Sequence, residues 1–141
     1  MEPSVYEVLD HTADLRLAYY GDDLPDLFRN AAYGMTAEML DGNIPVPTSG
    51  SLTVRLRRQE PDLHLRAWLA ELLYLLEAER LLTTRWEVRF DRRGTLIAKV
   101  SGVPVAEVAG RLKTEIKAVT YHGLRIEETA DGLRAEVIFD L

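Results

Sequence analysis

The stretch Asp10-His11-Thr12-Ala13-Asp14 places two carboxylates, an imidazole and a hydroxyl within five residues near the start of the chain. It lies between two short runs, 6–9 and 15–20, and the second alternates apolar and polar residues like a strand with one buried face. We therefore expect a polar connection between two strands. Its side chains fit two interpretations: an oxygen-rich cation site or acid/base cluster, and a turn in which Asp10 and Thr12 bond the local backbone.

Length and composition predict one globular domain over residues 1–141. The chain has 141 residues, of which 47% are hydrophobic and 28% charged. It contains no cysteine, which excludes disulfides and thiolate metal sites. No apolar run approaches the roughly 18 residues that a membrane helix needs, and the first residues do not resemble a signal peptide. We therefore expect a cytoplasmic protein that does not contact a membrane.

The net charge of −6 disfavours a protein that grips nucleic acid by its phosphates. If this protein acts near RNA, we expect a partner to hold the RNA. Arg55, Arg57 and Arg58 form a small basic cluster. This cluster fits either a surface facing RNA or a partner, or a solvated strand face.

Hydrophobic periodicity predicts an α+β fold. Apolar residues at helical spacing predict a helix from Leu24 to about Leu40, capped by Asp22 or Asp23 and ended by Gly42. A second helix is predicted from Pro61 to about Leu82, with Asp62 as its cap and His64 exposed. Strands are predicted over 52–57, 85–90, 96–100, 124–128 and 133–139, a short helix over 105–112, and either state over 115–121. This order favours two principal helices packed on a mainly antiparallel sheet.

Two further segments concentrate polar chemistry. Asp140 has the strand parity of Arg134 and Glu136, so it fits a solvated face, but with the α-carboxylate of Leu141 it also fits an acidic site. If these groups lie near Asp14, a cation or a basic residue must offset their repulsion. In the segment 115–123, Lys117 fits a group that neutralises an acidic site or contacts an anionic ligand, or else an ordinary surface residue before a turn that begins at His122-Gly123. No phosphate loop, dinucleotide fingerprint, serine elbow or paired-histidine zinc helix is present.

Taken together and in this order, the segments resemble the archease family over essentially the whole chain. The segments are Asp10-His11-Thr12-Ala13-Asp14, the run from Glu115 to His122, the ending Ile138-Phe139-Asp140-Leu141, and the core-helix run from Trp68 to Leu75. The resemblance implies a protein that activates an RtcB-type RNA ligase, which uses GTP and a divalent metal in tRNA splicing and RNA repair. In that role the protein promotes guanylylation of the ligase histidine and multiple turnover, and is not itself an enzyme.

The same resemblance implies which residues matter. The metal-binding residues of the family map onto Asp14, Asp140 and Leu141, and its functional lysine onto Lys117. His11, Tyr121 and His122 belong to the matched motifs and are expected as neighbours. The cation is divalent, with Ca²⁺, Mg²⁺ and Mn²⁺ all open, and Leu141 stands where the family often has isoleucine. Two other functions stay open: a small metal-dependent phosphoesterase or hydrolase using the same carboxylates, and a general chaperone for RNA-modifying enzymes.

Overall fold

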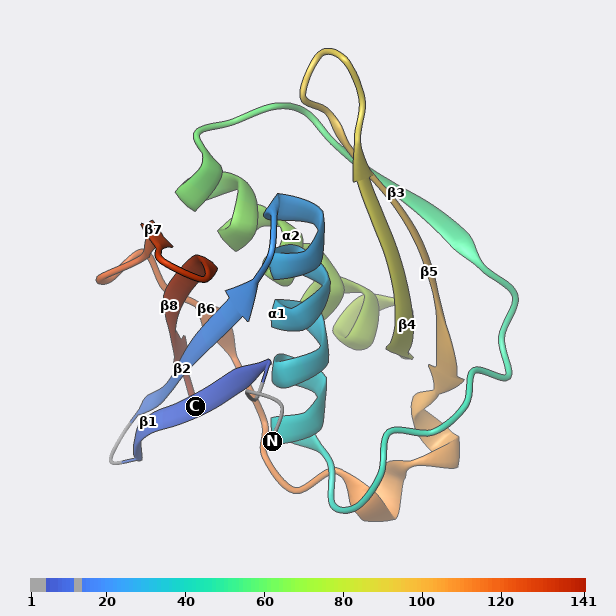
Figure 1. Cartoon of the computed structure of the whole chain (residues 1–141). Coiled ribbons are helices and arrows are strands. Elements are labelled where there is room, and N and C mark those ends of the chain that lie inside the picture. The colour runs from blue at the N-terminus through green and yellow to red at the C-terminus, as the bar shows by residue number, and fades with distance from the viewer. Residues whose placement is uncertain (1–4, 12–13) are drawn as a thin grey trace.

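The computed structural model describes residues 5–11 and 14–141 (Figure 1). Its elements, in chain order, are β1 (Tyr6–His11), β2 (Asp14–Gly21), α1 (Leu24–Met39), β3 (Leu52–Leu56), α2 (Pro61–Ala78), β4 (Leu81–Phe90), β5 (Leu96–Pro104), the 3₁₀ turns η1 (Val105–Glu107) and η2 (Ala109–Arg111), β6 (Ala118–Val119), β7 (Arg125–Thr129) and β8 (Gly132–Asp140). No helix in this described part is long and apolar enough to cross a membrane.

The described strands form two antiparallel sheets. A five-stranded sheet has the order β1-β2-β8-β6, with β7 also paired to β8, and a three-stranded sheet has the order β3-β5-β4. Helix α1 stands between the sheets and packs on β2 and β4, while α2 contacts β4 and β6 (Figure 1). The predicted α+β class is confirmed. Alternation identifies a strand but not its neighbours, so the division into two sheets was not predicted.

One contiguous core joins both sheets and both helices. The inward-facing residues of β2 and β8, such as Leu17 and Val137, lie fully buried beneath α1. Trp68 of α2 is also fully buried, and its indole N–H donates to the carbonyl oxygen of Phe28 at 2.9 Å. Full burial of an aliphatic side chain such as Leu17 or Val137 stabilises the fold by about 1.5–3 kcal/mol, so these residues fix how the elements pack.

Helix α2 differs from its prediction at both ends. The predicted cap Asp62 lies inside the helix, and its carboxylate accepts from the backbone N–H of Ile126 at 2.9 Å. The helix ends at Ala78, because Arg80 adopts φ = 54° and turns the chain into β4. Leu82 lies about two helical turns after the buried Leu75, and this spacing is why the prediction of Leu82 as the helix end was wrong.

The predictions for other segments had mixed outcomes. Asp23 caps α1 as expected, accepting from the Asp26 N–H at 2.9 Å. The helix ends at Met39, and Gly42 lies in the turn after it at φ = 82°. The helix predicted over 105–112 is a pair of 3₁₀ turns, and only residues 118–119 of the ambiguous segment form a strand.

His64 is buried, which contradicts the predicted exposure. It lies one helical turn before Trp68, on the inward face of α2, and is only 3% exposed. Its Nε2 lies 3.1 Å from the carbonyl oxygen of Leu56, and its ring packs edge-on against Phe28 and Phe90. The imidazole therefore joins α2 to β3 and β4.

Candidate functional site

Asp14 and Asp140 meet at one corner of the five-stranded sheet. Asp14 begins β2, Asp140 ends β8, and the two residues are direct partners in the antiparallel register. Facing residues of this kind have Cβ atoms about 4.5–5.5 Å apart. Both side chains are exposed. Residues from the two ends of the sequence thus present adjacent carboxylates to solvent.

Packing of the hydrophobic core fixes the register in which β2 pairs with β8. Leu15 faces Phe139 and Leu17 faces Val137 across the same two strands, and all four side chains are buried. A slip of one residue would turn these side chains toward solvent, so the register is strongly specified. The facing position of the two aspartates follows directly from that register.

The electrostatics of the corner favour a bound cation. Two like charges directly opposite on a sheet repel each other. The ion pairs found in the described part of the chain involve Arg16, Arg125 and Arg134, and none includes Asp14 or Asp140. Carboxylate oxygens are ligands that hard divalent cations prefer. The donor set therefore fits Ca²⁺, Mg²⁺ or Mn²⁺.

The described side chains of the corner do not form a complete metal cage. Among the described side chains, which leave out those of residues 1–4 and 10–13, no group of three or more His, Asp or Glu is placed to hold one metal ion. Such cations take six or more oxygen ligands. Two exposed carboxylates leave most of those positions to water, to main-chain oxygens or to a partner.

The backbone of Lys117 is hydrogen-bonded to the backbone of Asp140. Its N–H donates to the Asp140 carbonyl oxygen at 2.8 Å, and the next residue, Ala118, pairs with Asp140 in the sheet. The row Ala118–Asp140–Asp14 therefore crosses three strands at one edge. The Lys117 side chain is exposed at this edge.

Leu141 follows Asp140 and has the strand parity of the buried Phe139. It is half-buried and packs against the core. Its apolar side chain therefore holds this end of the chain against the sheet. The ligand role of its carboxylate stays a prediction.

Tyr121 and His122 lie in the turn between β6 and β7. Thr120 donates its N–H to the Ile138 carbonyl oxygen at 3.0 Å, so the turn that follows lies near Ile138 rather than Asp140. Both side chains in the turn are exposed, and the His122 N–H donates to Thr120 Oγ1 at 3.2 Å. No hydrogen bond among the described residues joins either side chain to the carboxylates of Asp14 or Asp140, and their expected neighbour role stays a prediction.

Arg66 of α2 supports this segment. Its Nε donates to the Val119 carbonyl oxygen at 2.9 Å, and its guanidinium carbon lies 3.8 Å from the centre of the Tyr121 ring. Such cation–π contacts contribute about 0.5–1 kcal/mol at exposed sites. No pattern in the sequence pointed to Arg66, because both of its partners lie far away along the chain.

Part of the first motif lies outside the described residues. Thr12 and Ala13 belong to that part, and the side chains of Asp10 and His11 are likewise not described. The backbone of His11 pairs with Leu15, and that of Asp10 with Arg16. The expected neighbour role of His11 stays a prediction.

Comparison with known protein families shows which family this chain belongs to. The model of the archease protein family matches residues 6–141. This chain belongs to the archease family. The archease of Methanosarcina acetivorans is 37% identical over 142 residues, covering 96% of this chain and 95% of that protein. The archease of Archaeoglobus fulgidus is 32% identical, covering 96% and 98%.

Solved structures agree with this family and fold. The solution structure of Methanobacterium thermoautotrophicum protein 1598 aligns with a TM-score of 0.81 and 29% identity, covering 99% of this chain and all of that one. A Thermotoga maritima crystal structure, described as an archease and possible chaperone, aligns with a TM-score of 0.64 and 21% identity, covering 96% of each chain. The second likeness supports the archease fold alone.

Proposed function

We propose that this archease activates an RtcB-type, GTP-dependent RNA ligase in tRNA splicing and RNA repair, in the cytoplasm. It acts as a protein cofactor that promotes guanylylation of the ligase histidine and so supports multiple turnover. Family membership supports this proposal, and one observation carries it: two exposed carboxylates face each other at a corner that the core holds in register.

Asp14 and Asp140 would hold a divalent cation in this role, with the carboxylate of Leu141 as a further ligand. The cation supplies Lewis-acid stabilisation of developing phosphate charge. The exposed corner leaves coordination positions open to the partner. The Lys117 side chain, at the same edge, either orients a carboxylate or stabilises phosphate charge.

Multiple-turnover ligation by the cognate ligase, with GTP and a divalent cation, tests the proposal. We expect this archease to raise turnover, and Asp14→Ala or Asp140→Ala to abolish the rise while the protein stays folded. Asp131→Ala is the matched control, because it removes an exposed carboxylate from the β7–β8 turn.

Other results would favour the other functions. Full activation by both alanine variants would indicate a chaperone that needs no cation. Hydrolysis of phosphoester substrates by the purified protein alone would indicate a metal-dependent phosphoesterase.

A further inference from the structure

The outer face of the three-stranded sheet carries a concentration of positive charge. Over residues 53–55, 85–90 and 96–100 of β3, β4 and β5, more exposed and more buried side chains alternate, so every second side chain there points away from the helices. The charged residues among them are Arg55, Arg85, Arg89, Lys99 and Glu87, all exposed. Four basic groups against one carboxylate give this face a local charge of +3, although the whole chain carries −6.

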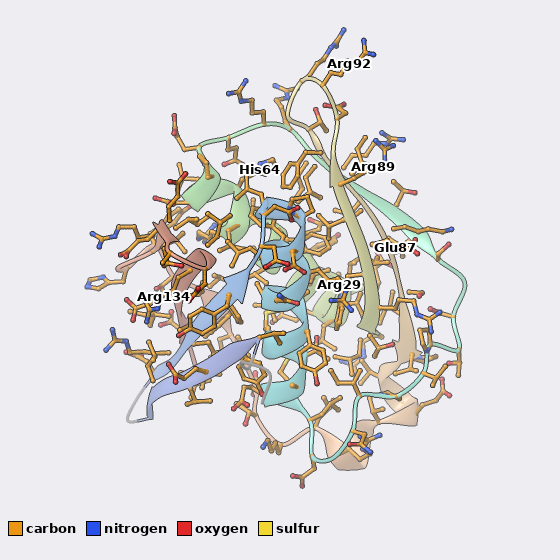
Figure 2. All side chains as sticks on the ribbon, viewed as in Figure 1. Arg29, His64, Glu87, Arg89, Arg92 and Arg134 are labelled. Carbon is orange, nitrogen blue, oxygen red and sulfur yellow. The ribbon has the colours of Figure 1, made fainter. Side chains whose placement is uncertain are left out.

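The strand register spreads these charges over the face. Arg55 and Arg89 both face Ile97 from opposite sides, so two strand spacings, roughly 10 Å, separate them. Arg85 and Arg89 lie four residues apart on β4, which is roughly 13 Å. In Figure 2, Arg89 points away from α1 on the outer side of this sheet. The guanidinium groups can therefore contact several separated anionic groups at once.

The basic surface continues to one end of the sheet. Arg57 and Arg58 follow β3, while Arg92 and Arg93 form the β4–β5 turn, with Arg92 at its tip (Figure 2). The nearby Asp91 carboxylate accepts from the N–H groups of Arg93 and Thr95, which holds it within the turn. Including these four arginines, the surface holds eight of the 17 Lys and Arg residues of the chain.

These basic groups are not neutralised by the fold. The ion pairs found in the described part of the chain lie on β2, β7 and β8. Lys99 and Glu87 face each other in the register, but they do not form an ion pair within 4.0 Å. Their charges are therefore available to a partner.

The chemistry of the face favours a phosphate backbone over a protein surface. Among the outward positions 53, 55, 85, 87, 89, 97 and 99, Ile97 is the one large apolar residue, while Leu52, on the opposite parity of β3, is 36% exposed. Protein interfaces are usually anchored by aromatic and apolar residues at their centre. Distributed guanidinium groups without such an anchor suit phosphates, which arginine binds bidentately.

We propose that the outer face of the β3-β5-β4 sheet binds RNA through its phosphates, independently of base sequence. The expectation that RNA is reached only through the ligase came from the net charge of the whole chain, whereas binding depends on local charge. The β3-β5-β4 sheet lies on the other side of α1 from β2 and β8 (Figure 1), the two strands that carry Asp14 and Asp140. The protein can therefore hold RNA on one side while the corner meets a partner, and this binding does not depend on the proposed ligase activation.

Fluorescence anisotropy with a labelled single-stranded RNA and the purified protein alone tests this proposal. We expect binding at low salt that weakens between about 50 and 200 mM salt, with a log–log slope of about −3 for four contacted phosphates. Arg55→Ala/Arg89→Ala should flatten the slope by about 1.4. The control Arg29→Ala/Arg125→Ala makes the same change in net charge away from the face, on α1 and β7, and should leave the slope unchanged.

Three results would overturn the proposal. One is the absence of RNA binding by the wild-type protein at low salt. Another is an equal loss of binding in the control variant, which would indicate a general charge effect. The third is equally strong competition by polyglutamate, which would assign the face to acidic proteins. Circular dichroism of each variant checks that it is folded, and no ligase is present, so failure of the ligase proposal cannot affect the result.

Discussion

At the scale of single residues, Asp14 and Asp140 form a pair whose repulsion a cation would relieve. Without a divalent cation, Asp140→Asn should be at least as stable as the wild type, because it removes a facing like charge worth about 0.2–1 kcal/mol. With the cation at 100 times its Kd, the wild type should gain about 2.7 kcal/mol and the variant little. Thermal unfolding with Ca²⁺, Mg²⁺ and Mn²⁺ in turn measures both effects. Asp131→Asn is the control and should gain as much stability from the cation as the wild type does. An equal gain in stability by Asp140→Asn would place the cation elsewhere.

Tyr19 is a second residue with a distinct physical consequence. Its ring is fully buried, and its hydroxyl has no hydrogen-bond partner among the described residues. Replacing an unpaired buried hydroxyl by an apolar group is neutral or stabilising, so Tyr19→Phe should raise the free energy of unfolding by up to about 1 kcal/mol. Tyr6→Phe provides the contrast, because it removes a hydrogen bond of 2.8 Å from the Tyr6 hydroxyl to Glu38 and should destabilise. Chemical denaturation of both variants measures the difference, and destabilisation by Tyr19→Phe would contradict the account.

The same tyrosine predicts how stability depends on alkaline pH. Burial, followed by the nearby charges of Tyr6 and Glu38, raises the pKa of Tyr19 well above its ordinary value near 10. The folded state therefore keeps a proton that the unfolded state loses above about pH 10. Above about pH 10, Tyr19 should therefore lower the free energy of unfolding by about 1.4 kcal/mol per pH unit. Tyr19→Phe should remove this part of the pH dependence. Chemical denaturation of the wild type and of Tyr19→Phe from pH 9 upward, about where the titration begins, measures this difference. The same pH dependence of the unfolding free energy in both proteins would contradict this assignment.

At the scale of elements, the Asp23 cap decides where α1 begins. The Asp23 carboxylate accepts from the Asp26 N–H, and Asp23→Ala should cost about 1 kcal/mol of stability. Asp22→Ala is the control, because it removes a neighbouring exposed carboxylate that does not cap the helix. The difference in unfolding free energy between the two variants measures the cap. Equal stability of the two variants would contradict it.

The elements also show what the sequence could predict. Period-two alternation correctly located strands such as β5 and β8, and helical spacing correctly located α1, because each pattern reflects one buried face. The end of α2 was missed because Leu82 lies seven residues, about two helical turns, after the buried Leu75, a spacing that fits a longer helix as well as the start of a buried strand. The burial of His64 was missed because it depends on Leu56, Phe28 and Phe90, which reach it only in the folded chain.

At the scale of the whole molecule, the candidate site depends on long-range pairing. The sequence identified Asp14, Lys117 and Asp140 as chemically suitable, but their meeting requires β2 and β6 to pair with opposite edges of β8. Local patterns do not encode that topology. Resemblance to the family grouped these three residues before the structure was known. The concentration of basic residues on the outer face of the three-stranded sheet follows only from the strand register.

The end of the chain offers another test at this scale. Leu141 packs against the core beside the corner, so residues added after it would replace its carboxylate by an amide at the exposed edge. We expect such an extension to reduce ligase activation on the order of tenfold or more, as loss of a metal ligand or its support commonly does. The same extension before Met1 should leave activation largely unchanged in the turnover assay. Full activation by the C-terminally extended protein would remove the carboxylate from the ligand set.

Guanylylation of the cognate ligase tests the central proposal most directly. Transfer of labelled guanylate from GTP to the ligase is measured with and without this archease, in the presence of a divalent cation. We predict faster guanylylation with the wild-type protein and no increase with Asp14→Ala or Asp140→Ala. Identical rates with and without the wild-type protein would contradict the proposed function.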